Sequence, residues 1–327
     1  MRSRQELALT ERREYPATKA PSARGWILAN AIRCPVCRRG LVADNSAYRC
    51  SGCGQFFAMT PEGQIDFRIP PGVSISYQQR YTPLAYDSTI QVAARREVAC
   101  AERRNQFAGP VPWHLTREQI TYIPEAKAGE IALDLGCGAG IHRSVLETLG
   151  YRYHGVDYAG AAADDLVDAH ALPYTDSTFD LVFAIALLEH LAQPVRVMQE
   201  VQRVLNASKH FIGTAAFLEP FHDNSFSHLS PLGLSNALQS SGFAVEAILA
   251  IRGWNAIRAQ LEMGFERARL PRWISHLLSQ PFVWAMEVYA FAGRSFASDK
   301  SRHSRDLAHA RHAGAFFFVA RKPTLTR

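Results

Sequence analysis

The residues best suited to chemistry in this chain lie in Ile131–Gly140, a short apolar run that contains Asp134 and then breaks into glycines. The glycines stand at alternate positions, Gly136, Gly138 and Gly140. Such a run predicts a buried parallel strand that turns sharply into a helix, here Ile141–Leu149. Glycine permits a positive φ and lets a ligand come close to main-chain N–H groups. The segment therefore predicts a nucleotide-type site at a strand–loop–helix junction.

Two common nucleotide sites do not fit this loop. The dinucleotide pattern needs a small residue where the chain has Ile141, and the phosphate-binding loop needs a lysine that is absent here. Downstream, a predicted second strand over Tyr153–Val156 ends in Asp157, and a carboxylate in that place can accept both hydroxyls of a ribose. Further strands are predicted over Phe179–Ile185 and His210–Ala215, and a helix is predicted over Trp113–Ile123.

The order of the motifs resembles the class I S-adenosylmethionine-dependent methyltransferases, with a type 11 core. The resemblance is carried by Leu133–Gly140, Asp168–Tyr174, Phe179–Val182 and Leu188-Glu189-His190. It implies an α/β, doubly wound, Rossmann-like sheet of seven mostly parallel strands, with S-adenosylmethionine as cofactor. The cofactor-binding residues that it implies are Asp134, Gly136, Cys137 and Gly138, then Asp157 for the ribose, then Asp168 and Ala169 for the adenine. Only ten residues separate Asp157 from Asp168, so an irregular crossover is expected there instead of a helix.

Four cysteines form a separate motif near the start of the chain. Cys34 and Cys37, and Cys50 and Cys53, make two C-x-x-C pairs separated by 12 residues. Four thiolates brought together in this way give the closed tetrahedral set of a structural Zn²⁺. We expect a zinc ribbon over residues 31–60 that does no chemistry, with free thiols as the alternative. The ribbon resembles that of the tRNA-methyltransferase activator protein, and also that of the rRNA guanine-N1 methyltransferases.

The charge of the 327-residue chain is unevenly distributed. The net charge of +6 divides into +6 for residues 1–60, −8 for 61–251 and +8 for 252–327. Basic ends favour contact with RNA or an anionic membrane surface, with a solvated surface as the alternative. We find no signal peptide and no apolar run of about 20 residues that would span a bilayer, so a cytoplasmic location is expected, with possible peripheral contact with a membrane.

The composition along the chain suggests four units. We expect a mobile basic arm over 1–30, the ribbon over 31–60, a linker and helical cover over 61–125, and a methyltransferase domain over 126–327. The domain carries a helical insertion over 254–297, before a last strand at Ala315–Ala320. Residues 281–293 are candidates for peripheral membrane contact, and packing against the core or a second subunit is the alternative. The sequence leaves the oligomeric state open.

The methyl acceptor is the least determined property. The fourth strand ends without the [DN]-P-P motif of amine methylation, and no Pro-Cys pair offers a thiolate for pyrimidine C5. An oxygen acceptor on a small molecule or glycan-type metabolite is favoured, and the loop Phe217–Leu229 suits its recognition. The alternatives are a guanine ring nitrogen of rRNA and a cofactor-binding scaffold without turnover. The candidates for a general base are His190, His222 and His228, and the catalytic residue itself stays unassigned.

Overall fold

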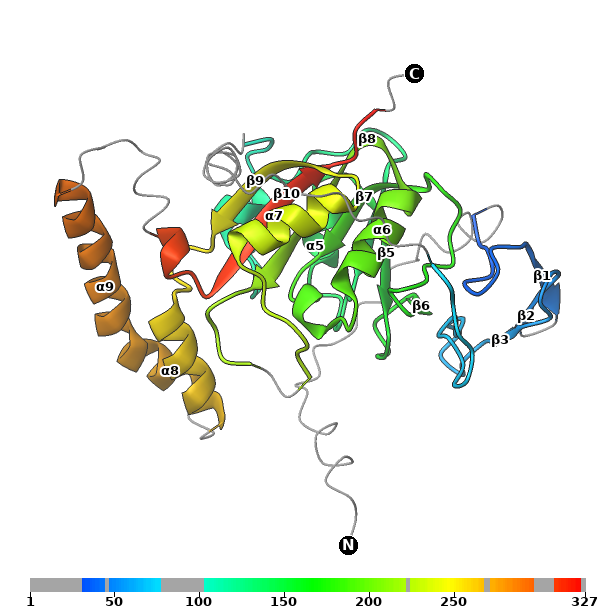
Figure 1. The fold of residues 1–327 in the computed structure, drawn as a ribbon, viewed down its shortest axis with the longest axis horizontal. Coiled ribbons are helices and arrows are strands. Elements are labelled where there is room, and N and C mark those ends of the chain that lie inside the picture. The colour runs from blue at the N-terminus through cyan, green and yellow to red at the C-terminus, as the bar shows by residue number, and fades with distance from the viewer. Residues whose placement is uncertain are drawn as a thin grey trace, which may run out of the picture.

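The computed structural model describes residues 31–44, 47–77, 103–221, 224–267, 271–296 and 309–324. These residues form a three-stranded sheet and a seven-stranded sheet flanked by helices (Figure 1). The basic arm 1–30, His222 and residues 78–102 of the linker and helical cover expected over 61–125 lie outside the described residues.

The large sheet has the spatial order β6-β5-β4-β7-β8-β10-β9. Its strands are β4 (Ile131–Leu135), β5 (Arg152–Asp157), β6 (Asp165–Leu166), β7 (Phe179–Ala184), β8 (Leu205–Ala216), β9 (Ala244–Ala250) and β10 (Ala315–Arg321). Strand β10 runs antiparallel to both of its neighbours, and the other pairings, from β6 to β8, are parallel. The mostly parallel seven-stranded sheet is therefore confirmed.

Helices cover both faces of this sheet. They are α4 (Arg117–Ile120), α5 (Arg143–Thr148), α6 (Pro194–Val204) and α7 (Pro231–Ser240), with a 3-10 turn η1 at Leu188–His190. Because successive strand residues point to opposite faces, Phe316 and Phe318 join one hydrophobic cluster and Phe317 joins the other. The first cluster contains α6 and α7, and the second contains α4 and α5, which is the doubly wound arrangement.

Two elements differ from their sequence prediction, and the crossover after Asp157 agrees with it. The crossover after Asp157 is irregular, as expected, and the strand that follows it is only Asp165–Leu166. Strand β8 begins directly after α6, five residues before the predicted start at His210. The helix expected over Trp113–Ile123 is the single turn α4, because its capping box at Thr116 sets the start and the residue before Pro124 disfavours helical backbone.

The cysteine module is a small antiparallel sheet at the β6 end of the molecule. Its strands are β1 (Leu41–Asp44), β2 (Ala47–Cys50) and β3 (Phe56–Ala58). The chain then runs along β6, where the Phe67 N–H donates to the Leu166 carbonyl at 2.8 Å and the Leu166 N–H donates to the Ile65 carbonyl at 3.0 Å. The side chains of Ile65 and Phe67 are buried in the α6–α7 cluster. Residues 65–67 thus extend the large sheet by one irregular edge segment.

The expected C-terminal helices are α8 (Ala256–Arg267) and α9 (Arg272–Phe296). They pack against each other beside β9, at the opposite end of the long axis from the cysteine module (Figure 1). Among the described helices, none has the length and apolarity needed to cross a bilayer.

Candidate active site

Main-chain hydrogen bonds hold the glycine loop after β4 against β5. The N–H groups of Gly136 and Cys137 both donate to the Val156 carbonyl, at 2.8 and 3.0 Å. Gly136 and Gly138 have φ of +76° and +54°, which favours glycine. A Cβ at 136 would lie 2.8 Å from Leu187 Cδ1, whereas a Cβ at 138 would meet nothing within 4 Å. The loop therefore leaves open space over Gly138, where a ligand can approach its backbone.

Asp157 stands next to this open space at the end of β5. Its Oδ2 accepts the N–H of Gly138 at 2.8 Å, and its Oδ1 accepts the N–H of Ala159 at 3.1 Å. The side chain is half-buried. Each carboxylate oxygen therefore has a fixed direction and a remaining lone pair, which is the geometry needed to accept two neighbouring hydroxyl groups.

Asp134 lies beneath the glycine loop. It is fully buried, and its Oδ2 accepts the Tyr153 hydroxyl at 2.8 Å and lies 3.7 Å from His142 Nδ1. Its Oδ1 is buried and has no hydrogen-bond partner among the described residues. Burial, followed by the Asp134 charge, raises the pKa of Cys137 well above its ordinary value, so this residue is a neutral thiol that fills space. Sequence reasoning missed His142, whose two ring nitrogens are also buried and have no hydrogen bond to any residue that the structure describes.

Asp168 and Ala169 follow β6 at the same edge of the sheet. The main-chain N–H of His170 donates to Asp168 Oδ1 at 3.0 Å, and His170 Nδ1 lies 2.8 Å from that oxygen. Because the Gln193 N–H donates to His170 Nε2, the ring proton belongs on Nδ1. Burial acts to raise the pKa of Asp168, but the His170 hydrogen bonds outweigh it, and the pKa is lowered. Asp168 is therefore an ionised acceptor at neutral pH.

A second group of titratable residues lies at the end of β7. Glu189 is 5% exposed, and its Oε2 has no hydrogen-bond partner among the described residues. Burial raises the pKa of Glu189 to about 7, and the charge of Glu219 adds to the rise. His190 Nε2 lies 4.0 Å from Glu189 Oε1, and His190 Nδ1 lies 3.3 Å from the Asn224 carbonyl. Sequence reasoning singled out His190 and missed Glu189, because burial is not visible in a motif.

The loop after β8 lies close to this group. The N–H of Phe226 donates to the main-chain carbonyl of Glu189 at 2.7 Å. Phe221 and Phe226 are 69% and 67% exposed, so they present aromatic surface at this edge of the sheet. His228 Nδ1 lies 3.2 Å from the Phe217 carbonyl. Of the two candidate bases that the structure describes, His190 and His228, His190 lies beside the buried carboxyl group of Glu189.

The segment after the cysteine module supports the irregular crossover. The Gln64 side-chain amide donates to the carbonyls of Gly160 and Ala163, at 3.0 and 2.7 Å. Arg68 donates to the Tyr158 carbonyl at 3.3 Å and its guanidinium stands 5.5 Å from the centre of the Tyr158 ring. Tyr158 directly follows Asp157, so residues from the N-terminal segment hold the loop that leads away from the ribose position. No local pattern in the sequence predicts this contact.

The four cysteines converge as the ligands of a metal ion would. Their Sγ atoms all lie within 4.8 Å of one another, with Cys34 and Cys53 at 3.7 Å and Cys37 and Cys50 at 3.3 Å. A tetrahedron with Zn–S bonds of about 2.3 Å needs sulfur separations of about 3.8 Å. Burial acts to raise the pKa of Cys50, but hydrogen bonds, including those from the Cys53 and Gly52 N–H groups, lower it to about 6. The arrangement fits a closed structural site for Zn²⁺.

An ionic contact joins this module to the methyltransferase-like core. Arg38 follows Cys37, and it donates to the Leu172 carbonyl at 2.7 Å and to the buried Glu200 carboxylate at 2.6 Å. Glu200 also accepts the Leu172 N–H at 2.9 Å and pairs with Arg203. The module is therefore tied to the segment that follows the Asp168–Ala169 pair.

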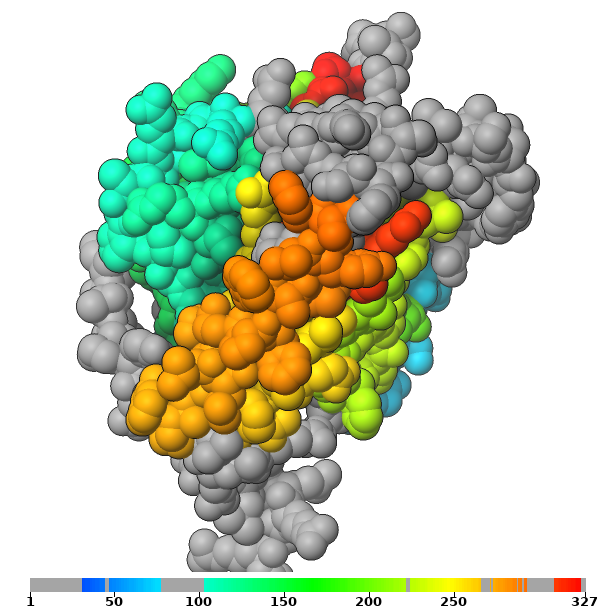
Figure 2. Space-filling view, turned by 90° about the vertical axis from the view of Figure 1, so that its left-hand side faces the viewer, coloured from blue at the N-terminus to red at the C-terminus, as the bar shows by residue number. Residues whose placement is uncertain are grey.

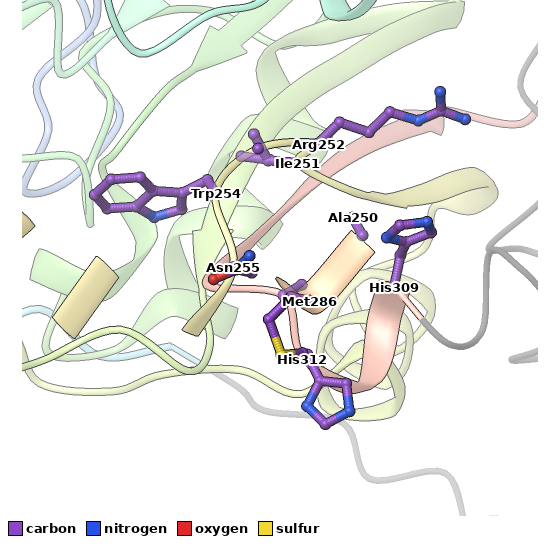
Figure 3. Close-up of a pocket in the computed structure, with 10 residues that line it drawn as sticks. Ala250, Ile251, Arg252, Trp254, Asn255, Met286, His309 and His312 are labelled. Atoms are coloured by element: carbon purple, nitrogen blue, oxygen red, sulfur yellow. The ribbon is translucent and has the colours of Figure 1, made fainter. Parts of the chain in front are cut away.

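A separate pocket lies at the far end of the sheet, between the end of β9 and the start of β10. Met286 from α9 and His309 and His312 from the segment before β10 surround it, with Trp254 and Asn255 opposite (Figure 3). None of the expected cofactor residues lines this pocket. The Trp254 indole N–H donates to Glu219 Oε2 at 2.7 Å, and this hydrogen bond links the segment just before α8 to the loop after β8.

Comparison with known proteins identifies the core. Residues 133–213 match a family model described as a methyltransferase domain. This core is a methyltransferase domain. The matched residues of the methyltransferase domain run from β4 into β8, and they include the glycine loop, Asp157, Asp168 and His190.

Two relatives show how much of the chain is shared. Methyltransferase GfsG of Streptomyces halstedii is 31% identical over 106 residues, which are 27% of this chain and 38% of GfsG. A 37.1 kDa protein in transposon TN4556 of Streptomyces fradiae is 25% identical over 225 residues, 52% of this chain and 64% of that protein. The match thus spans less than two thirds of the length of either relative.

The similar solved structures are more distant in sequence. An S-adenosylmethionine-dependent methyltransferase from Mesorhizobium loti is 17% identical, with a TM-score of 0.40 over 63% of this chain and 94% of that chain. The Haemonchus contortus phosphoethanolamine N-methyltransferase 2, in complex with S-adenosyl-L-methionine, is 16% identical, with a TM-score of 0.42 over 67% of this chain and 55% of that chain.

Proposed function

We propose that this protein is an S-adenosylmethionine-dependent methyltransferase that methylates a hydroxyl group of a small molecule or glycan-type metabolite. The observation that carries the proposal is the open space over Gly138, bordered by the Asp157 carboxylate at the carboxyl end of the parallel strands. Ligands of open α/β sheets bind at that edge. The match of residues 133–213 to a methyltransferase domain supports the same assignment.

The residues present fit the cofactor. Asp157 would bind the ribose hydroxyls, and Asp168 with the Ala169 N–H would bind the adenine. Asp134 Oδ1, a buried acceptor with no hydrogen bond among the described residues, would accept from the methionine ammonium group or from a water bound to it. Gly136, Cys137 and Gly138 provide the backbone of the loop. When bound, S-adenosylmethionine supplies a methyl group on a cationic sulfonium.

A hydroxyl acceptor must lose its proton, and His190 is our candidate for the general base. The contact of Nδ1 with the Asn224 carbonyl favours a proton on Nδ1, which leaves Nε2 as an acceptor. The Glu189 carboxylate, 4.0 Å from Nε2, would stabilise the imidazolium after proton transfer. Phe221 and Phe226 would border the acceptor, and general-base catalysis of this kind contributes about 10²–10⁴-fold.

The cofactor assignment is tested by titrating S-adenosylhomocysteine into the purified protein. Replacement of Asp157 by Ala should weaken binding by about 1–3 kcal/mol, because it leaves the ribose hydroxyls and the Gly138 N–H without their acceptor. Asp44→Ala, which removes an exposed carboxylate on β1, is the matched control and should bind like the wild type. No binding of the sulfur cofactor by the wild type would contradict the assignment.

The acceptor is tested by transfer of a labelled methyl group onto fractionated cell extract. Label in small metabolites or lipid-linked glycans supports the proposal, whereas label in ribosomal RNA would favour the guanine ring-nitrogen alternative. Cofactor binding without transfer to any fraction would favour a scaffold without turnover. His190→Gln should lower the rate and remove the acidic limb of the pH–rate profile, because only the unprotonated imidazole can act as the base, while it leaves cofactor affinity unchanged.

A further inference from the structure

Helix α9 carries large apolar side chains on its outer surface. Trp273, Leu277, Trp284 and Val288 are 69%, 64%, 71% and 45% exposed. At 3.6 residues per turn these four positions fall within an arc of about 60°, so they form one stripe along the helix. Figure 2 shows α9, in orange, lying across the outside of the molecule over α8.

The opposite face of α9 is the one that packs. Ser275 and Ser279 are buried, and the Ser279 hydroxyl donates to Glu262 of α8 at 2.8 Å. Met286, on the same side, lines the pocket beside β9 and β10. The helix therefore buries small hydroxyl side chains and exposes tryptophans, which reverses the usual arrangement of an amphipathic helix. An apolar stripe of this kind marks an interaction site.

Charge distinguishes the two plausible occupants of this stripe. Arginines precede and open the helix at 267, 269 and 272, and the residues from 294 to 305 contain four further basic residues against one acidic residue. A second copy packed on the same stripe would bring these like charges together. Anionic lipid headgroups would instead neutralise them, each basic residue near the surface contributing about 1 kcal/mol. Tryptophan side chains also favour the boundary between lipid and water.

We propose that the Trp273–Leu277–Trp284–Val288 stripe of α9 docks the protein on the surface of an anionic lipid bilayer. The helix lies in the plane of the surface with its stripe among the acyl-chain ends. The stripe covers 15 residue steps of the helix, so the contact is about 22 Å long. This docking is independent of the identity of the methyl acceptor.

The proposal is tested by sedimentation of the full chain with phosphatidylcholine vesicles, with and without phosphatidylglycerol. We expect sedimentation only with the anionic vesicles, together with a blue shift of tryptophan emission. Trp284→Glu and Leu277→Glu should each weaken vesicle binding by about tenfold or more, which corresponds to about 1.4 kcal/mol. Val42→Glu is the matched control, because Val42 is 60% exposed on β1 at the other end of the molecule.

Retained cofactor affinity and an unchanged melting temperature would show that the glutamate variants are folded. The proposal would be overturned by equal binding of variants and wild type, by equal binding to neutral and anionic vesicles, or by no binding of the wild type. Sedimentation velocity covers the other occupant: a wild-type dimer that Trp284→Glu dissociates would assign the stripe to a second copy.

Discussion

Replacement of Gln64 by Leu tests whether the N-terminal segment supports cofactor binding. Gln64 is 4% exposed, and its amide donates to the carbonyls of Gly160 and Ala163 in the crossover after Asp157. Leucine keeps most of the volume and removes both hydrogen bonds. Gly160 is exposed and can turn to water, whereas Ala163 is buried and cannot.

The magnitude follows from that one buried carbonyl. An unsatisfied buried acceptor costs about 1–3 kcal/mol. If the crossover loosens to let water reach the carbonyl, binding must reorder the Asp157–Ala159 turn, and the affinity for S-adenosylhomocysteine should fall by about 5- to 150-fold. Isothermal titration measures the affinity, and urea denaturation measures the parallel loss of stability.

Gln55→Leu is the matched control, because within the described part of the chain its amide donates only to the adjacent Phe56 carbonyl, at 3.4 Å. It should bind the cofactor product like the wild type. An affinity of Gln64→Leu within twofold of the wild type would refute the reasoning, since the crossover would then keep its shape without this segment.

The remaining predictions concern the buried charges and the metal. Glu200→Gln should destabilise the fold by about 3–5 kcal/mol in urea denaturation, because Arg38 and Arg203 lose their buried carboxylate; an unchanged midpoint would contradict this. Glu189 has a folded pKa near 7 against an ordinary value of 4.5, so its stabilising contribution is complete below pH 4.5 and is lost as the pH rises through 7. Glu189→Gln should therefore be more stable than the wild type at pH 8, by up to about 3 kcal/mol, and equal to it at pH 4; the opposite order at pH 8 would contradict the pKa. Elemental analysis should find one zinc per chain, and Cys37→Ser should lower both zinc content and melting temperature, whereas a protein without zinc that melts normally would contradict the site.

The strands of the methyltransferase domain were the most predictable part of the fold. A buried strand gives a short apolar run in the sequence, and such runs predicted β4, β5, β7 and β10 to within about a residue or two. The glycine loop was equally predictable from the sequence, because its positive φ values restrict the residue type.

Contacts between segments far apart in the chain could not be predicted from the sequence. The sequence predicts the ribbon and the region after residue 60 as a module and a linker. In the structure, Phe57, Ile65 and Phe67 share one hydrophobic cluster with Val156 and Tyr174. The chain supplies no local signal for such packing, since an exposed linker and a sheet-edge segment have similar composition. The raised pKa of Glu189 could not be predicted for the same reason, because the burial that raises it depends on residues far away in the sequence.

The position of residues 65–67 along β6 also bears on solubility. Strand β6 is the outermost strand of the large sheet, and an uncovered strand edge is a template for pairing with other chains. Residues 65–67 pair with this strand edge within the molecule, through the main-chain hydrogen bonds of Ile65 and Phe67 with Leu166. A fragment that begins at residue 126 would keep the glycine loop and every strand of the large sheet. It would, however, expose the β6 edge and the apolar surface that Phe67 covers. The N-terminal segment thus shields the methyltransferase domain from edge-to-edge aggregation.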